Sequence, residues 1–425
     1  MSSRIPGFYR LPPEARLSAL EIALGRDLED FRQSDGLSLE AADLMVENVI
    51  GTFKLPNAVG INLMLNGKDV VVPMVVEEPS VVAAVSNMAR LTRAAGGIFA
   101  DADPSLMIGQ IQVIGPDPDT MQARLEAALP QLEEKASKVH PRLVERGGGL
   151  RGITLRQVHY DEPGEDSESY VVLHFVLDCV DAMGANMVNT VAETLAPDVE
   201  TISGGRVGLR ILSNLADQRL ARARVHLRPE HLDHGDLAGE EVARGIAEAY
   251  RFAYADPYRA ATHNKGIMNG VDAVALATGN DWRAIEAGAH AYAARSGQYR
   301  SLSQWKIDAD GSLHGSLELP LQVGTVGGPI RVHPTVQHNL ELLGITKAGE
   351  LAQVMAAVGL VQNLGALRAL ATEGIQQGHM RMHARSVAAT AGATGAEVHM
   401  VAQALHQAKD FSAAKAKAIL AELRA

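Results

Sequence analysis

Residues 106–218 alternate strand and helix patterns in an order that few folds can accommodate. Strand patterns lie at residues 110–114, 153–158, 170–177 and 206–212, and helical patterns lie at residues 121–138 and 181–195. The order is therefore β-α-β-β-α-β, which predicts a compact unit of the ferredoxin-like type. Because helical and strand-like sequence continues on both sides, we expect this unit to be inserted into a larger domain.

The predicted fold class is α+β. The insertion and a C-terminal flap divide the chain into four segments. We expect a large mixed helical and strand domain made from residues 1–105 and 219–374, with a small domain at residues 106–218. Residues 375–425 are expected to form a small C-terminal helical flap. Its helices are expected near residues 379–391, 397–406 and 412–423, separated by glycines at positions 374, 378, 392 and 395. A small unit tethered through glycines is suited to move as a lid.

Local signals define several elements before the insertion. Leu11-Pro12-Pro13-Glu14 is typical of a helix start, because proline is tolerated in the first helical turn. Asn66-Gly67 lies between two apolar runs and predicts a tight hairpin. The second run, residues 70–76, is expected to be a mostly buried strand that delivers the sequence Glu77-Glu78-Pro79-Ser80 at its end. Residues 80–95 then predict a helix.

Composition and charge exclude several classes of function. The chain has 425 residues, of which 47% are apolar, and its net charge of −11 would repel a nucleic-acid backbone. A single cysteine, Cys179, excludes an intrachain disulfide and fits a reducing compartment. The N-terminus lacks the pattern of a signal peptide, and we find no apolar run of roughly 18 residues. We therefore expect a cytoplasmic protein without a nucleic-acid or membrane partner.

Two glycine-containing motifs are candidates for a phosphate site. Gly147-Gly148-Gly149-Leu150-Arg151-Gly152 matches G-x-G-x-x-G, but it follows a helix and precedes a strand, which is the reverse of a Rossmann site. We interpret it as a connection between elements. Asp181-Ala182-Met183-Gly184-Ala185-Asn186 follows a buried strand, and we expect Asp181 to cap the next helix, whose free backbone donors attract pyrophosphate. A capped helix without a ligand is the alternative.

A polar stretch around Lys265 has the composition of a ligand-binding loop. Residues 257–270 carry cationic and amide side chains among glycines, and Asp281 follows sixteen residues after Lys265. A lysine beside an acid places a fixed positive charge where a carbonyl oxygen becomes negative during a reaction. The alternative is a solvated loop with a surface ion pair.

His379 and His383 are spaced by one helical turn in the expected flap. This spacing suits metal ligation, but the glutamate that zincin chemistry needs after the first histidine is replaced by Met380. We therefore predict no metal site. His379 follows Gly378 on the flap, and a histidine is suited to protonate a leaving group near neutral pH.

Six strings of residues, taken in order along nearly the whole chain, resemble one family. They are Glu47-Asn48-Val49-Ile50-Gly51-Thr52-Phe53, Val76-Glu77-Glu78-Pro79-Ser80, Asp181-Ala182-Met183-Gly184-Ala185-Asn186, Thr262-His263-Asn264-Lys265-Gly266, Gly324-Thr325-Val326-Gly327-Gly328 and Gly378-His379-Met380. The family is 3-hydroxy-3-methylglutaryl-coenzyme A (HMG-CoA) reductase. The Thr-His-Asn-Lys-Gly form around the lysine resembles its soluble class II branch.

The resemblance implies a four-electron reaction. HMG-CoA and two reduced nicotinamides give mevalonate, free coenzyme A and two oxidised nicotinamides, through two hydride transfers at one carbon. By the same resemblance, Lys265 polarises the carbonyl and Asp281 holds this lysine in a hydrogen-bond network. Glu78 supplies and recovers a proton at the carbonyl oxygen. His379 protonates the coenzyme A thiolate as it leaves.

The resemblance also implies the binding residues and the assembly. Arg259 would grip the terminal carboxylate of the HMG group with a bidentate fork. The other residues matched to the substrate pocket are Ser80, Asn269, Gln362 and Asn363. The residues matched to the cofactor side are Asp181, Met183, Gly184, Asn186 and Asn214. We expect a homodimer with shared active sites, or a hexamer of three dimers, because family members form such assemblies.

The nicotinamide and the direction of the reaction leave alternatives open. An acid near the adenosine ribose favours NAD, whereas a basic residue favours NADP; this chain has Val139-His140-Pro141-Arg142 where related NAD users can carry an acid. We expect NAD and the oxidation of mevalonate, because the chain resembles the mevalonate-degrading branch. The alternatives are an NADP-using biosynthetic reductase, a coenzyme A transferase or acyltransferase, and a non-catalytic acyl-CoA-binding protein.

Overall fold

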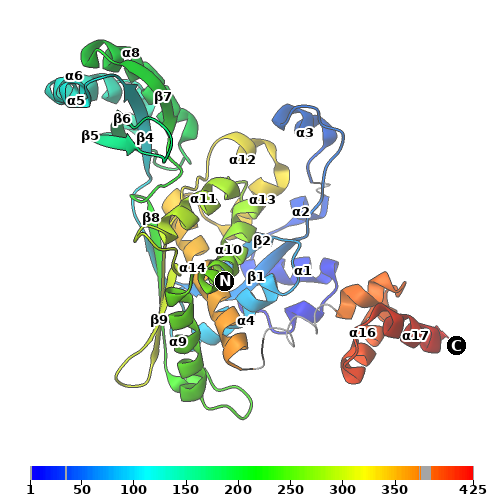
Figure 1. Cartoon of the computed structure of the whole chain (residues 1–425). Helices are drawn as coiled ribbons and strands as arrows, with labels where there is room; N and C mark the ends of the chain where they lie inside the picture. The colour runs from blue at the N-terminus through cyan, green and yellow to red at the C-terminus, as the bar shows by residue number, and fades with distance from the viewer. Residues whose placement is uncertain (1, 34–35, 373, 375–383, 425) are drawn as a thin grey trace.

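The computed structural model describes residues 2–33, 36–372, 374 and 384–424 (Figure 1). Its strands form three sheets, with the orders β1-β2, β3-β8-β10-β9 and β5-β6-β4-β7. The third sheet and its helices form a separate small unit of residues 106–212, and the other elements up to residue 372 form what we call the large unit (Figure 1). The mixed α and β content agrees with the predicted fold class.

The N-terminal part of the large unit is built on the predicted hairpin. Strands β1 (Asn57–Leu65) and β2 (Lys68–Val75) pair antiparallel, and Asn66 and Gly67 between them have φ angles of 49° and 77°. Positive φ at both turn residues is what a two-residue hairpin loop of this twist requires, so the prediction is confirmed. The neighbouring helices are η1 (Phe8–Arg10), α1 (Pro13–Leu24), α2 (Glu29–Gln33), α3 (Leu39–Met45) and α4 (Val81–Arg93). Helix α1 begins where the proline signal predicts.

Helix α14 (Ala348–Ala371) is the centre of the large unit. It packs against α10 (Pro257–Ala277), α4 and α9 (Gly239–Ala255). Its composition and length would suffice to cross a membrane, but 67% of its apolar window is buried inside the protein. A helix that is apolar on all sides and surrounded by other elements is a core helix. The remaining helices of the large unit are η2 (Pro229–His231), α11 (Trp282–Ala293), α12 (Gly328–Val332) and α13 (Pro334–Leu343).

Lys265 lies on helix α10, so the expectation of a glycine-rich loop is wrong. Asp256 caps this helix by accepting a hydrogen bond from the backbone N–H of Arg259, and Pro257 occupies its first turn. The buried residues of α10 recur at helical spacing, and Gly270 sits tightly against Val358 of α14. Gly270 is therefore a point of close helix packing, whereas a Cβ atom at Gly266 would meet no atom within 4 Å. The Asp-Pro start is the sequence signal that would have predicted the helix.

An antiparallel four-stranded sheet covers one side of these helices. Its strands are β3 (Phe99–Ala102), β8 (Leu220–Leu227), β10 (Leu313–Pro320) and β9 (Ser303–Ile307). Trp305 on β9 is 1% exposed and lies against Gly315, where a Cβ atom would come within 2.2 Å of its ring. The sheet thus contributes one large aromatic side chain to a core made mainly of aliphatic residues.

The small unit has four antiparallel strands with helices packed on the sheet. Its strands are β4 (Leu106–Ile114), β5 (Gly149–Tyr160), β6 (Glu168–Asp178) and β7 (Arg206–Leu212). Its helices are α5 (Pro118–Ala127), α6 (Leu129–Ser137), α7 (Pro141–Glu145) and α8 (Ala185–Ser203). The single helix expected at residues 121–138 is broken at Ala128, because Pro130 lacks a backbone N–H and its ring crowds the preceding turn. Gly147 and Gly148 connect α7 to β5, and Gly149 is the first residue of β5, in agreement with the interpretation of the triple glycine as a connection.

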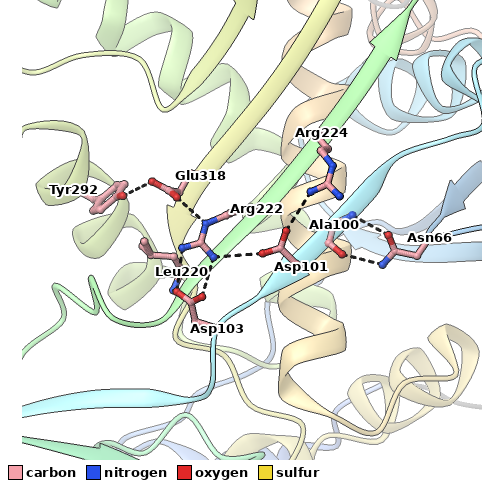
Figure 2. Close-up of polar contacts among 9 residues, drawn as sticks. All are labelled: Asn66, Ala100, Asp101, Asp103, Leu220, Arg222, Arg224, Tyr292 and Glu318. Atoms are coloured by element: carbon pink, nitrogen blue, oxygen red, sulfur yellow. Dashed lines mark hydrogen bonds and ion pairs between the residues drawn. The ribbon is translucent and has the colours of Figure 1, made fainter.

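The chain crosses between the large and small units twice, at neighbouring points. Asp103 follows β3 and exchanges hydrogen bonds with Leu220 at the start of β8: its N–H donates to the Leu220 carbonyl at 2.8 Å, and its carboxylate accepts from the Leu220 N–H at 3.2 Å. Figure 2 shows that Arg222 binds both Asp103 and Glu318, each with a contact of 2.8 Å. Hydrogen bonding to Asp103 is the main cause that raises the pKa of Arg222 above its usual range.

The C-terminal segment has a small core of its own. Residues 384–390 are helical, and α16 (Ala396–Ala408) and α17 (Ala413–Arg424) follow. Ala388, Val401 and Leu420 belong to one buried cluster that joins the three helices. Helices at two of the three predicted positions are therefore confirmed, and the third is confirmed for residues 384–390. His379, Met380 and His383 lie outside the described residues, and movement of this segment as a lid stays a prediction.

Candidate active site

The structure brings Lys265 and Glu78 together. The Nζ atom of Lys265 on α10 donates to Oε2 of Glu78 at 2.6 Å, and Glu78 lies in the bend that follows β2. The two residues are 187 positions apart in the sequence. The lysine side chain is 60% exposed and the glutamate side chain is 30% exposed, so the pair contributes little to stability. An accessible ammonium with a carboxylate beside it suits chemistry at a carbonyl oxygen.

Three predicted substrate residues lie close to this pair in the sequence. Ser80 follows Glu78 by two residues, and Arg259 and Asn269 are on α10 with Lys265. Ser80 precedes α4 with a φ of 80°, a left-handed conformation that is strained for a residue other than glycine. Asn269 is half-buried one helical turn beyond Lys265 on α10. Arg259, at the start of α10, is also half-buried, and burial lowers the pKa of its guanidinium. Within the described part of the chain its guanidinium has no acidic partner, which leaves it available to an anion.

Gln362 and Asn363, also predicted for the substrate pocket, are buried in α14. Asn363 is 1% exposed, and its Oδ1 accepts from the Ser303 hydroxyl at 2.9 Å and from the Trp305 indole N–H at 2.7 Å. Its Nδ2 lies 3.2 Å from Nε2 of His263. The Oε1 atom of Gln362 is buried without a hydrogen-bond partner among the described residues. Gln362 therefore has an unpaired buried acceptor, whereas Asn363 is held by hydrogen bonds within the protein.

His263 was not singled out as a separate site residue, yet it links the Lys265 helix to the core. Its Nε2 is 2.6 Å from the Ser303 hydroxyl, and its side chain is 2% exposed. Burial, with a smaller effect of nearby Arg259, lowers the pKa of His263 to about 3. The imidazole therefore stays neutral near pH 7 and fixes α10 against β9 and α14. Its position two residues before Lys265 in the Thr-His-Asn-Lys-Gly string was the available signal.

Asp281 and His379 are not brought to Lys265 by the described residues. Asp281 caps α11 by accepting from the Ala284 N–H at 3.1 Å, and its carboxylate lies 3.4 Å from the Arg283 guanidinium. Its side chain is 45% exposed. His379 lies outside the described residues. The roles of both residues remain predictions.

The predicted cofactor residues lie at the start of α8, where one expectation is corrected. Gly184, with a φ of 108°, occupies the N-cap position of α8, and Asp181 does not cap this helix. The Asp181 carboxylate instead accepts from the Ala348 N–H at 3.0 Å, at the start of α14. The partner is 167 residues away, so a local rule could not find it. Gly184 packs so closely that a Cβ atom would come within 2.4 Å of the Cys179 sulfur.

The other predicted cofactor residues are Met183, Asn186 and Asn214. Met183 is half-buried, and Asn186 and Asn214 are exposed. Asn214 lies just after β7, and its backbone carbonyl accepts from Gln322 of the large unit at 3.0 Å. Both asparagine side chains are thus accessible near the junction of the two units.

A cleft runs past Asp181 between the small and large units. It consists of two cavities of about 440 and 490 Å³ that share Arg146, Val180 and Asp181 as lining residues. The cavity on the small unit is also lined by His140 and Arg142, and the other cavity by Lys347. The basic side chains of the cavity on the small unit and a nearby helix start suit the phosphates of a dinucleotide. The cavity that contains Lys347 is also lined by the acidic residues Asp103, Asp178 and Glu350. Arg146 and Lys347 were missed by the sequence prediction, although Arg146 follows Arg142 by one helical turn.

Metal-ligand residue types gather elsewhere. Among the described residues, His226, Asp308 and Asp310 have ligand atoms within 4.8 Å of one another, and all three side chains are exposed. They belong to β8 and to the turn between β9 and β10. None of them is among the predicted site residues.

Comparisons with known proteins identify the family. The sequence model described as hydroxymethylglutaryl-coenzyme A reductase matches residues 12–384. The HMG-CoA reductase of Archaeoglobus fulgidus is 48% identical, covering 100% of this chain and 95% of that protein. A probable HMG-CoA reductase of Borreliella burgdorferi is 36% identical, covering 81% of this chain and 77% of that protein. The chain therefore belongs to the HMG-CoA reductase family.

Solved structures narrow the identification. The HMG-CoA reductase of Streptococcus pneumoniae has a TM-score of 0.83 and 41% identity, covering 98% of this chain and 99% of that chain. A second structure, the class II reductase of the same organism bound to NADPH in open conformations, has a TM-score of 0.81 and 41% identity, with 98% and 100% coverage. The predicted resemblance to class II HMG-CoA reductases is thus confirmed.

Proposed function

We propose that this protein interconverts HMG-CoA and mevalonate in a four-electron reaction with two nicotinamide dinucleotides. The observation that carries the proposal is the contact of 2.6 Å between Lys265 and Glu78, on an accessible surface of α10. Arg259, on the same helix, is half-buried and has no acidic partner among the described residues. A guanidinium in this state is suited to hold a substrate carboxylate in two hydrogen bonds.

In this proposal Lys265 acts on the reacting oxygen. The reduced nicotinamide supplies the hydride, and negative charge develops on the thioester oxygen as the carbonyl carbon receives it. The Lys265 ammonium donates a hydrogen bond to this oxygen and stabilises it, an effect worth about 10²- to 10³-fold in rate for one preorganised donor. Glu78, in contact with Lys265, supplies the proton that converts the oxyanion to a hydroxyl in each reduction. Arg259 and Asn269 hold the acyl group in place.

Between the two reductions the bond from carbon to sulfur breaks, and Glu78 takes the hydroxyl proton back as the carbonyl forms again. The thiolate of coenzyme A then needs a proton, which we assign to His379 of the C-terminal segment. Asp281 is proposed to act on the same centre from the start of α11. A second copy of the chain would bring further residues to the site, and exposed Ile50 and Phe53, which are 102% and 90% exposed, support a homodimer.

Two candidates for the cofactor follow from different observations. The resemblance to the degradative branch favours NAD and the oxidation of mevalonate. The cleft favours NADP instead, because His140, Arg142 and Arg146 line one cavity and would attract a 2′-phosphate. The 41% identical structure bound to NADPH supports the second candidate. Initial rates with each cofactor at equal concentration, in both directions, distinguish them.

The test of the reaction is HMG-CoA-dependent oxidation of NADH or NADPH, followed by the absorbance of the reduced cofactor. Two nicotinamides should be consumed for each coenzyme A thiol released. Lys265→Ala is expected to lower kcat by about 10²-fold or more, whereas Lys68→Ala, an exposed lysine on β2, should leave it unchanged. Coenzyme A exchange without any absorbance change would favour a transferase and refute the reductase proposal. Binding of acyl-CoA without turnover would favour a sensor and refute it equally.

A further inference from the structure

The turn that precedes α8, residues 181–184, is joined to the large unit by its main chain. The Asp181 carbonyl accepts from the Thr325 N–H at 2.9 Å, and Ala182 forms a parallel bridge with Val326. Gly324 lies so close that a Cβ atom there would come within 2.6 Å of the Met183 nitrogen. The proposed cofactor turn of the small unit therefore rests on residues 323–326 of the large unit. This glycine-containing segment has no role in the chemistry described above.

Arg219 lies beneath this contact and is 3% exposed. Its guanidinium donates to the carbonyls of Met183 at 3.0 Å and Ala182 at 3.4 Å, and also to the Val323 carbonyl. A further hydrogen bond reaches the Ser105 hydroxyl at 3.0 Å, at the other chain crossing. Burial lowers the pKa of Arg219 to about 10, so the side chain remains protonated near pH 7. One buried cation thus binds the cofactor turn, the segment 323–326 and the chain crossing at Ser105 together.

The same segment continues to the predicted catalytic residue Asp281. The side-chain amide of Asn280 donates to the Gly324 carbonyl at 3.1 Å and accepts from the Gly324 N–H at 2.7 Å. Asn280 directly precedes Asp281, the N-cap of α11. Residues 323–326 therefore form a connecting segment that contacts the cofactor turn on one side and the start of α11 on the other.

We propose that Arg219 is a positioning residue that fixes the turn 181–184 against the connecting segment 323–326. It thereby sets where the nicotinamide dinucleotide lies relative to Lys265. The inference rests on the proposed function. Hydride transfer requires the donor and acceptor carbons at about 3–3.5 Å in the right orientation, so a small shift of the turn is expected to lower the rate. Arg219 itself touches neither substrate nor cofactor.

An arginine is required here because the acceptors lie in several directions. Guanidinium presents five donors in a rigid plane, whereas the ammonium of lysine is a compact group that reaches fewer of these oxygens at once. Arg219→Lys keeps the charge and removes part of the donor set. Ser105→Ala removes one acceptor and leaves the guanidinium in place. The two variants therefore test the geometry of the contact separately from the buried charge.

The experiment measures steady-state kinetics of Arg219→Lys, Arg219→Met and Ser105→Ala, together with thermal unfolding. For Arg219→Lys we expect the KM for the reduced nicotinamide to rise about tenfold or more, with the KM for HMG-CoA within about twofold of the parent. Nicotinamide deuterated at the transferred position should show a larger primary isotope effect on kcat, because hydride transfer becomes slower. Ser105→Ala should raise the KM for the reduced nicotinamide by about two- to fivefold, and it should also raise the isotope effect on kcat.

Arg222→Met is the matched control. It removes an arginine of β8 that binds Asp103 at the chain crossing and Glu318 (Figure 2). Among the described residues, the hydrogen bonds of the Arg222 guanidinium go to acidic side chains and none reaches the turn 181–184. We expect its KM for the nicotinamide and its isotope effect to match those of the parent. An equal change in Arg222→Met and Arg219→Lys would overturn the inference, because the loss of any contact at the chain crossings would then suffice.

The failure of this inference is distinguishable from failure of the proposed function. A parent protein that shows no HMG-CoA-dependent oxidation of either nicotinamide refutes the proposed function. An active parent, with an unchanged nicotinamide KM and isotope effect in folded Arg219→Lys, refutes the positioning role alone. If Arg219→Met does not fold, the result is decided by Arg219→Lys and Ser105→Ala.

Discussion

Asp272 of α10 and Glu286 of α11 form a half-buried carboxyl pair between the helix of Lys265 and the helix capped by Asp281. The Oδ1 atom of Asp272 is buried without a hydrogen-bond partner among the described residues. Burial, followed by the hydrogen bond with Glu286, raises the pKa of Asp272 to about 9. The Glu286 carboxylate also lies 2.5 Å from Nε2 of His290. Burial raises the pKa of Glu286, but the hydrogen bonds with His290 and Asp272 outweigh burial, so the pKa of Glu286 is lowered. Asp272 thus carries a proton at neutral pH.

This proton makes stability depend on pH with a definite sign. Between the unfolded pKa of 3.8 and the folded value of about 9, the folded protein keeps a proton that the unfolded chain has lost. The free energy of unfolding must therefore fall as the pH rises through this window. At about 1.4 kcal/mol for each unit of pH, the fall between pH 5 and pH 8 has an upper limit of about 4 kcal/mol.

Asp272→Asn keeps a donor for Glu286 and cannot ionise. We expect the variant to lose this fall, so that it is more stable than the parent at pH 8 by an amount on the order of 2–4 kcal/mol, with a smaller gain at pH 5. Urea unfolding followed by far-ultraviolet circular dichroism at the two pH values measures the difference. Asp236→Asn, at an exposed position, serves as the control. Equal pH dependence in Asp272→Asn and the parent would refute a proton on Asp272.

Three further predictions concern the cleft and the core. Arg142→Glu should weaken binding of NADPH by about tenfold while changing binding of NADH much less, because only NADPH carries the 2′-phosphate; fluorescence titration with both cofactors measures this. Cys179 should react with thiol reagents only on unfolding, because burial raises its pKa to about 12; a folded protein that reacts rapidly would contradict this. Asn363→Leu should lower the free energy of unfolding by about 2–4 kcal/mol, since it leaves the donors of Trp305 and Ser303 unpaired, and this loss is measured by urea unfolding.

The features that the sequence predicted well are those set by nearby residues. The hairpin at Asn66 and Gly67 and the helix start at Pro13 depend on backbone conformations that few residue types adopt. Family strings located Glu78 and Lys265, and the structure places them in contact. Their proximity could not follow from spacing, because 187 residues separate them.

The features that the sequence missed depend on distant partners. Lys265 was expected in a loop because α10 is rich in polar residues, but Gly270 packs against α14 and the Asn264 amide donates to the Arg300 carbonyl, just before β9. Asp181 was expected to cap α8, yet its partner is the first N–H of α14. Arg219 gave no signal, because it lies next to Asp217 and Gln218 and close to Arg222 and Arg224, in a charged stretch that is typical of the surface. In each case tertiary contacts, which sequence periodicity does not describe, decided the outcome.

The two chain crossings at Asp103 and Leu220 lie side by side, so the small unit is an insertion with adjacent ends. Because the residues that enter and leave it are hydrogen-bonded to each other, a short linker could join β3 to β8 and leave the path of the surrounding sheet unchanged. Insertions with adjacent ends tolerate exchange and divergence well. Under the proposed function, cofactor preference could be changed by substitutions in the insert and at its contacts with residues 323–326, while α10 and α14 keep their sequence.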